Sequence, residues 1–121
     1  MDNKAAAPAR DNHCDQICPM VYAMNIIGQK WKIPLLWNLA EYGSLHYNEL
    51  RRVIAPITKT MLTRCLRELE ESGMVERLNH NTIPPSVEYR LTERGASLMP
   101  ALRELYRWGT AQQNQARNAG Q

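Results

Sequence analysis

Apolar and polar positions along the chain fall into short blocks with a helical period. Residues 20–27 carry apolar side chains at the spacing of one helix face, and Gly28 follows them as a stop. Residues 30–42 repeat this pattern, and Gly43 is expected to end the helix that they form. Pro34 is tolerated there because the N–H groups of a first helical turn have no partner within the helix. The pattern predicts two helices near the start of the ordered chain.

The next block predicts a short extended piece and then a short helix at 47–53. The buried stripe of this helix is expected at Leu50, Val53 and Ile54. Pro56 blocks continuation of the helix, so residues 55–58 are expected to form a turn.

A longer amphipathic helix is predicted to run to Ser72, with Thr58 as its N-cap and Gly73 after its last turn. Successive residues are about 100° apart around a helix axis. One arc is apolar and consists of Met61, Leu62, Cys65, Leu66 and Leu69. The opposite arc is basic and rich in hydroxyl groups, and consists of Lys59, Thr60, Thr63, Arg64 and Arg67. Basic side chains near a helix N-terminus oppose the macrodipole, so helix stability does not explain them.

Two alternating segments, 74–79 and 86–91, predict short strands joined by a loop. The helical period then returns after Thr92, which is a good N-cap, and Pro100 kinks this C-terminal helix or delays its regular start. The predicted fold class is mainly α with a small β-ribbon. A helix, a turn, a second helix and a ribbon, in this order, form a winged helix-turn-helix.

Length and composition suit one soluble domain of 121 residues, 44% of them apolar, with a net charge of +3. The domain is expected at 14–112, between a disordered arm at 1–13 and a frayed tail at 113–121. No apolar run is long enough for a membrane span, and the N-terminus lacks a signal-peptide core, so a cytoplasmic location is expected.

Three cysteines without an export signal argue against a disulfide scaffold, and Cys65 is expected in the core. The chain has no nucleophile elbow, phosphate loop or metal-binding helix motif, so neither enzyme activity nor a cofactor is expected. His13, Cys14 and Cys18 carry metal-ligating side chains, but they lack a clear fourth ligand and zinc-finger spacing, so no metal is expected.

The basic arc is what a recognition helix presents to the major groove of DNA, where Arg64 can bind guanine through two hydrogen bonds. Further DNA contacts are expected from Tyr47, Asn48 and Arg51 on the short helix, from Arg77 and Arg90 on the strands, and from His80, Asn81 and Thr82 at the tip of the wing. The alternative is an ordinary amphipathic helix with a solvated charged face, followed by a plain hairpin.

Several motifs follow one another along most of the chain. They are "CP" at 18–19, "IIGQKWKIPLLWNL" at 26–39, "NELRR" at 48–52, "ITKTMLTRCLRELEESGMVER" at 57–77 and "PPSVEYRLTERG" at 84–95, with a late Trp108–Gly109. Together they resemble the HxlR-type winged-helix regulators of bacteria, distant relatives of the MarR regulators. The family often has an Arg-Phe pair where this chain has His46-Tyr47, which puts one phosphate contact in doubt.

The resemblance implies a dimeric, DNA-binding transcription regulator whose first and last helices build the dimer. The interface is then expected at Met20, Met24, Leu98, Leu102, Leu105, Tyr106 and Trp108. A two-fold dimer presents two recognition helices about 34 Å apart and favours a palindromic site. Repression is the commoner mode in the family. A winged-helix module that contacts proteins without DNA readout is the alternative.

Several HxlR-type regulators sense oxidants, quinones or aldehydes through the cysteine before the N-terminal proline, which is Cys18 here. At a helix N-terminus the N–H groups and the dipole stabilise a thiolate. Cys14 lies one helical turn earlier and is placed to resolve an oxidised Cys18. The alternative is that neither cysteine has a role.

Overall fold

A computed structural model describes residues 18–84 and 86–120. The helices are α1 Pro19–Ile27, α2 Lys32–Tyr42, α3 Tyr47–Val53, α4 Lys59–Glu71, α5 Glu93–Ser97 and α6 Met99–Ala119, and the strands are β1 Ser44–His46, β2 Val75–His80 and β3 Ser86–Leu91. The predicted arm at 1–13 and the residues His13 and Cys14 lie outside this described part of the chain.

The predicted helix boundaries near the N-terminus are close to those in the structure. α1 ends at Ile27 with Gly28 as its C-cap, and α3 covers 47–53, as expected. α2 starts at Lys32, two residues later than the pattern indicated. Gly43 ends α2 with a φ of 84°, which glycine adopts without strain, and its N–H donates to the carbonyl of Leu39 at 2.9 Å.

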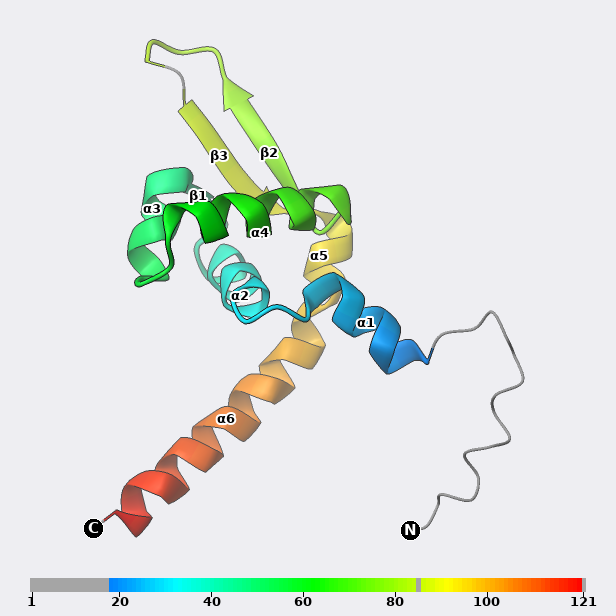
Figure 1. Ribbon diagram of the computed structural model, residues 1–121, viewed down its shortest axis with the longest axis vertical. Coiled ribbons are helices and arrows are strands. Elements are labelled where there is room, and N and C mark those ends of the chain that lie inside the picture. The colour runs from blue at the N-terminus through cyan, green and yellow to red at the C-terminus, as the bar shows by residue number, and fades with distance from the viewer. Residues whose placement is uncertain (1–17, 85, 121) are drawn as a thin grey trace.

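The predicted two-stranded ribbon is a three-stranded antiparallel sheet in the order β1-β3-β2 (Figure 1). β1 pairs with β3 so that Leu45 lies opposite Tyr89, and both side chains are buried. This cross-strand contact joins the start of the helix-turn-helix to the wing. On the other side of β3, Val75 lies opposite Leu91 and His80 opposite Ser86.

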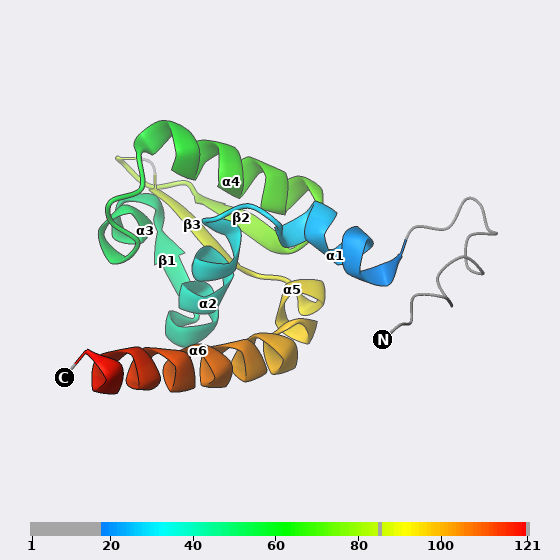
Figure 2. The same cartoon turned by 60° about the horizontal axis from the view of Figure 1, so that its bottom comes forward.

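The core is centred on α2, which lies between α4 and α6 (Figure 2). Leu35, Leu36 and Leu39 of α2 are fully buried. They pack with other buried apolar residues, namely Ile27, Leu45, Leu50, Ile54, Ile57, Leu62, Cys65, Leu66, Leu69, Met74, Val75, Tyr89, Met99 and Leu102. Full burial of one such leucine is worth about 2 kcal/mol. The core therefore fixes α4 on α2 through the apolar arc that the sequence predicted.

The buried stripe predicted for α3 is wrong at Val53, which is 41% exposed. Leu50 and Ile54 are four residues apart and face the core together, whereas Val53 lies at the end of α3 and points away from that face. α3 is thus anchored by fewer apolar side chains than expected.

The predicted C-terminal helix is divided into α5 and α6, which meet at Leu98. Pro100 lies in the first turn of α6, where it needs no N–H partner, so it delays the start of the long helix. α6 then continues to Ala119, well past the boundary expected at residue 112. None of the helices in residues 18–84 and 86–120 is long and apolar enough to cross a membrane.

Candidate DNA interface

The helix α4 is held at both ends by hydrogen bonds that its sequence encodes. The Thr58 hydroxyl accepts a hydrogen bond from the Met61 N–H at 3.1 Å, as expected of an N-cap. Ser72 caps the C-terminus, and Gly73 follows with a φ of 80°. These caps fix which residues form the first turns of α4 and therefore which side chains those turns display.

The outer arc of α4 is exposed, as predicted from its period. It carries Lys59, Thr60, Thr63, Arg64 and Arg67. Its inner arc is buried at Leu62, Cys65, Leu66 and Leu69. The basic side chains are therefore available to a partner outside the protein, and the apolar arc is not.

Tyr47 connects the start of α3 to α4. Its hydroxyl donates to the Lys59 carbonyl at 3.2 Å and shares a hydrogen bond of 2.9 Å with the Thr63 hydroxyl. A hollow of about 540 Å³ is lined by Tyr47, Lys59, Thr60, Thr63, Arg64 and Arg67. Tyr47 thus links α3 to the first two turns of α4, and a phosphate contact of its hydroxyl stays a prediction.

A second basic hollow lies at the end of α3 and the following turn. It is lined by Asn48, Arg51, Arg52, Ala55, Pro56 and Ile57. Arg52 was not among the predicted site residues, although it neighbours Arg51 and is exposed. Since both arginines lie in the last turn of α3, their charges also complement its dipole.

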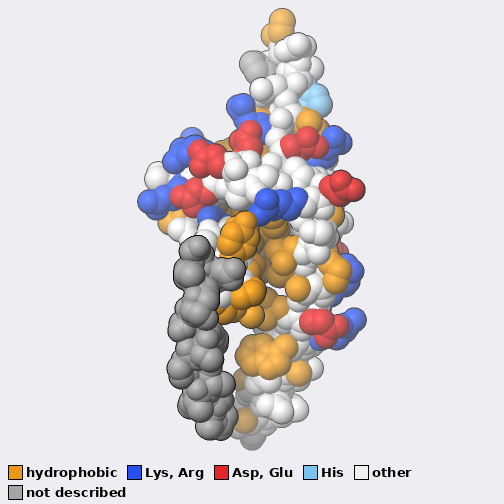
Figure 3. Space-filling view, turned by 90° about the vertical axis from the view of Figure 1, so that its right-hand side faces the viewer, with side chains coloured by type: hydrophobic (Ala, Val, Ile, Leu, Met, Phe, Trp, Pro, Cys, Tyr) orange, Lys and Arg blue, Asp and Glu red, His pale blue; other side chains and the backbone are white. Residues whose placement is uncertain are grey.

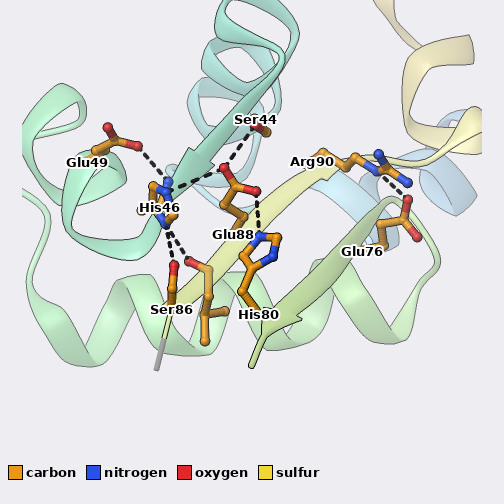
Figure 4. Close-up of polar contacts among 9 residues, drawn as sticks. Ser44, His46, Glu49, Glu76, His80, Ser86, Glu88 and Arg90 are labelled. Atoms are coloured by element: carbon orange, nitrogen blue, oxygen red, sulfur yellow. Dashed lines mark hydrogen bonds and ion pairs between the residues drawn. The ribbon is translucent and has the colours of Figure 1, made fainter. Parts of the chain in front are cut away.

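The wing differs from the sequence-based expectation at His80. This residue was expected at the tip, but it ends β2, and its Nε2 lies 2.9 Å from Oε1 of Glu88 (Figure 4). Asn81 and Thr82 follow in the loop, where the Thr82 hydroxyl donates to the Pro84 carbonyl at 2.8 Å. Ile83 is 99% exposed.

Glu88 of β3 joins the wing to the helix-turn-helix. His46 Nε2 lies 3.4 Å from its Oε2, and the Ser44 hydroxyl is 3.4 Å from the same oxygen (Figure 4). The hydrogen bond from His80 and the positive potential of the two histidines lower the pKa of the Glu88 carboxyl. The backbone N–H of His46 also donates to the Glu49 carboxylate at 2.8 Å, and this hydrogen bond caps α3.

The two strand arginines have different surroundings. Arg77 is exposed on β2. Arg90 makes an ion pair with Glu76 on the neighbouring strand, with 2.6 Å between Nε and Oε2 (Figure 4). Arg90 therefore offers less net charge to a partner than Arg77.

Lys32 is a feature that sequence reasoning did not single out. Lys32 is the first residue of α2, and its side chain is buried. Its Nζ lies 2.9 Å from Oε1 of Glu68 on α4. This hydrogen bond from Lys32 lowers the pKa of the Glu68 carboxyl. The two residues are far apart in the chain, and only the packing of α2 against α4 brings them together.

Cys18 and Cys65, the two cysteines in the described part of the chain, occupy the positions that the sequence indicated. Cys18 is the exposed N-cap residue of α1, directly before Pro19. Cys65 is buried in the core; its thiol donates to Gln29 at 3.4 Å, and burial raises its pKa. No group of three metal-ligating side chains forms within 18–84 and 86–120.

Hydrophobic side chains gather on one face below the charged region of the molecule (Figure 3). The exposed large apolar residues of α1 and α6 are Met20, Val21, Tyr22, Met24, Leu105, Tyr106 and Trp108. Leu102, which was expected in a dimer interface, is 4% exposed and packs into the core of this chain. Leu98 is half-buried against the same core. Tyr106 stacks on Trp37, with 4.8 Å between ring centroids.

The fold and the exposed basic helix define a winged helix-turn-helix protein of the DNA-binding class. A family model described as HxlR-like helix-turn-helix matches residues 26–117, and the chain belongs to that family. It is a transcription regulator with a helix-turn-helix DNA-binding domain.

Individual relatives cover most of the chain. An HTH-type transcriptional regulator of Methanothermobacter thermautotrophicus is 43% identical over 107 residues, which are 88% of this chain and 81% of that protein. The redox regulator HypR in its oxidised form is 41% identical, with a TM-score of 0.74 over 78% of this chain and 96% of that one. Reduced YodB of Bacillus subtilis is 32% identical, with a TM-score of 0.68 over 77% and 91% of the two chains.

Proposed function

We propose that this protein binds a specific DNA sequence through the outer arc of α4 and represses transcription by occupying a promoter. The observation that carries the proposal is the exposure of Thr60, Thr63, Arg64 and Arg67 on one helix face whose opposite face is buried. In this arrangement the first turns of α4 enter the major groove, and the arginines of α3 and the wing lie along phosphates.

The test is a fluorescence-anisotropy titration against the DNA upstream of its own gene and a scrambled duplex, at several salt concentrations. Arg64→Ala should weaken specific binding by about 1–3 kcal/mol and relax the preference at one base pair. Lys59→Ala should weaken both duplexes alike and reduce the salt dependence. Unchanged affinity in both variants would refute this placement of the groove face. Absence of binding even at low salt would favour a winged-helix module that contacts proteins.

The proposed DNA-binding form is a homodimer built from the exposed apolar faces of α1 and α6. Trp108 is 63% exposed and Met20 is 66% exposed, which is unfavourable for side chains of this size unless a second subunit covers them. A two-fold dimer places two α4 helices on successive turns of the duplex, about 34 Å apart, so the operator is palindromic. Sedimentation equilibrium tests this: Trp108→Ser should shift the protein towards the monomer.

The proposed signal is an oxidant or electrophile that reacts with Cys18. Cys18 is the exposed N-cap residue of α1, and the positive end of a helix dipole stabilises a thiolate. HypR, a relative of 41% identity, is a redox regulator. A peroxide would transfer one oxygen to the Cys18 thiolate, giving a sulfenic acid and an alkoxide. The Cys14 thiolate would then displace hydroxide and form a disulfide.

Cys18→Ser tests the sensor without disturbing the DNA-binding face. Under reducing conditions the variant should bind the operator as the wild type does. After peroxide treatment the wild type should lose affinity while Cys18→Ser retains it. An oxidant response that survives the substitution would exclude Cys18 from the mechanism.

A further inference from the structure

Among the residues that the structure describes, Lys32 is the one charged side chain that is buried, with 6% of its surface exposed. An ammonium group inside a protein costs free energy unless a hydrogen-bonded anion compensates it. The compensating anion is Glu68, at 2.9 Å, on the recognition helix and not on the helix that carries Lys32. The buried lysine therefore acts directly on α4.

The second oxygen of Glu68 faces Arg64. Oε2 of Glu68 lies 3.9 Å from Nε of Arg64, one helical turn away, beyond the usual length of a hydrogen bond. The Arg64 side chain is 53% exposed. The Glu68 carboxylate therefore makes a short hydrogen bond with Lys32 and only a long ion pair with Arg64.

We propose that Lys32 is a positioning residue for DNA readout, because it keeps the Glu68 carboxylate bound to itself and so leaves the Arg64 guanidinium on the groove face of α4. This inference rests on the proposed function of α4 as the recognition helix. It adds a specificity determinant that lies in the core and touches no DNA.

The physical reason is competition for one carboxylate. Without the ammonium of Lys32, Arg64 is the nearest cation to Glu68, four residues away on the same helix face. The carboxylate then pairs with Arg64 by two hydrogen bonds, and this pair must break before Arg64 can bind guanine.

A double-mutant cycle tests the inference with Lys32→Met, Glu68→Gln and the double variant. Lys32→Met should weaken operator binding roughly twofold to fivefold, the upper part of the range of a surface ion pair. Glu68→Gln alone should bind at least as tightly as the wild type. The double variant should bind like Glu68→Gln, because no carboxylate remains to capture Arg64. A loss of affinity in Glu68→Gln and a larger loss in the double variant would overturn the proposal. That pattern would mean that the ion pair of Lys32 and Glu68 only holds α4 against α2.

A parallel series separates this inference from the proposed function. In an Arg64→Ala background, Lys32→Met should change operator affinity less than twofold, because its effect acts through Arg64. If the wild type fails to bind the operator, the proposed function fails. The proposed role of Lys32 alone fails if the wild type binds the operator, Arg64→Ala weakens this binding, and Lys32→Met leaves it unchanged. Should Lys32→Met not fold, as judged by circular dichroism, Glu68→Gln still decides, because a structural tie predicts weaker binding for it.

Discussion

Replacement of Thr92 by alanine should destabilise the protein by about 2 kcal/mol, roughly twice the cost of the same change at Thr58. The Thr92 hydroxyl accepts a hydrogen bond from the Gly95 N–H at 3.0 Å and donates one to the Gly73 carbonyl at 2.5 Å. The first bond caps α5. The second ties the start of α5 to the turn that closes α4. Within the described residues, the Thr58 hydroxyl makes one hydrogen bond, which it accepts from the Met61 N–H at 3.1 Å.

The magnitudes follow from counting these bonds. Loss of a threonine N-cap costs about 1 kcal/mol, and a further partly buried hydrogen bond contributes about 1 kcal/mol. The expected losses are therefore about 2 kcal/mol for Thr92→Ala and about 1 kcal/mol for Thr58→Ala. Thr92→Ser keeps the hydroxyl and should remain within about 0.5 kcal/mol of the wild type.

Urea unfolding followed by far-ultraviolet circular dichroism measures these differences. All variants are compared at one protein concentration, because dimer formation adds to the apparent stability. Equal losses for Thr92→Ala and Thr58→Ala would refute the reasoning, since the bond to Gly73 would then contribute nothing. A loss in Thr92→Ser as large as in Thr92→Ala would refute it as well.

Two other predictions concern packing and pH. A Cβ on Gly95 would lie 2.1 Å from the Met74 carbonyl oxygen, so Gly95→Ala should cost about 1–3 kcal/mol, whereas Gly109→Ala meets nothing within 4 Å and should gain up to about 1 kcal/mol of helix propensity; urea unfolding of both variants checks this. The hydrogen bond from His80 lowers the pKa of Glu88 below its ordinary value of 4.5, so the stability it contributes is present above that value and is lost as pH falls through the lower folded pKa. The unfolding midpoint of Glu88→Gln should therefore lie below that of the wild type at pH 6 and approach it at pH 3, and a gap that widens towards pH 3 would contradict this assignment.

α4, the proposed recognition helix, could be predicted in detail because the signals that define it are local in the sequence. The cap at Thr58, the glycine at Gly73 and the spacing of apolar residues between them each act within one or two helical turns. A helix with this pattern has one orientation relative to the core. Its exposed arc then follows from geometry alone, without knowledge of the rest of the fold.

Contacts between distant segments could not be predicted in this way. β1 is a strand of three residues, too short for an alternating pattern, and its partner β3 lies more than forty residues later. The pairing of Lys32 with Glu68 and the hydrogen bonds of Tyr47 likewise depend on how helices pack. His80 was misplaced because the end of β2 is set by its register with Ser86, and no local signal marks it.

Periodicity also could not assign the apolar residues of α6 to one interface or another. Leu98, Leu102 and Leu105 recur at a helical spacing, yet Leu102 is buried in this chain and Leu105 is 46% exposed. A stripe wider than the local core needs a second surface to cover it. Only the path of α6 across α2 shows which of its apolar residues pack into the core of this chain and which remain exposed.

α2 contacts both the recognition helix and the proposed dimer helix, and this determines how the two are related. At its start Lys32 holds Glu68 of α4, and in its middle Trp37 stacks on Tyr106 of α6. The leucines between these contacts are fully buried, and a close-packed interior transmits strain between the elements that it joins. In the proposed dimer, we therefore expect a shift of α6 against its partner to displace α4 as well. On this proposal the dimer interface sets the distance between the two α4 helices, and the proposed sensor Cys18 is the N-cap of α1, one of the two helices proposed to form that interface.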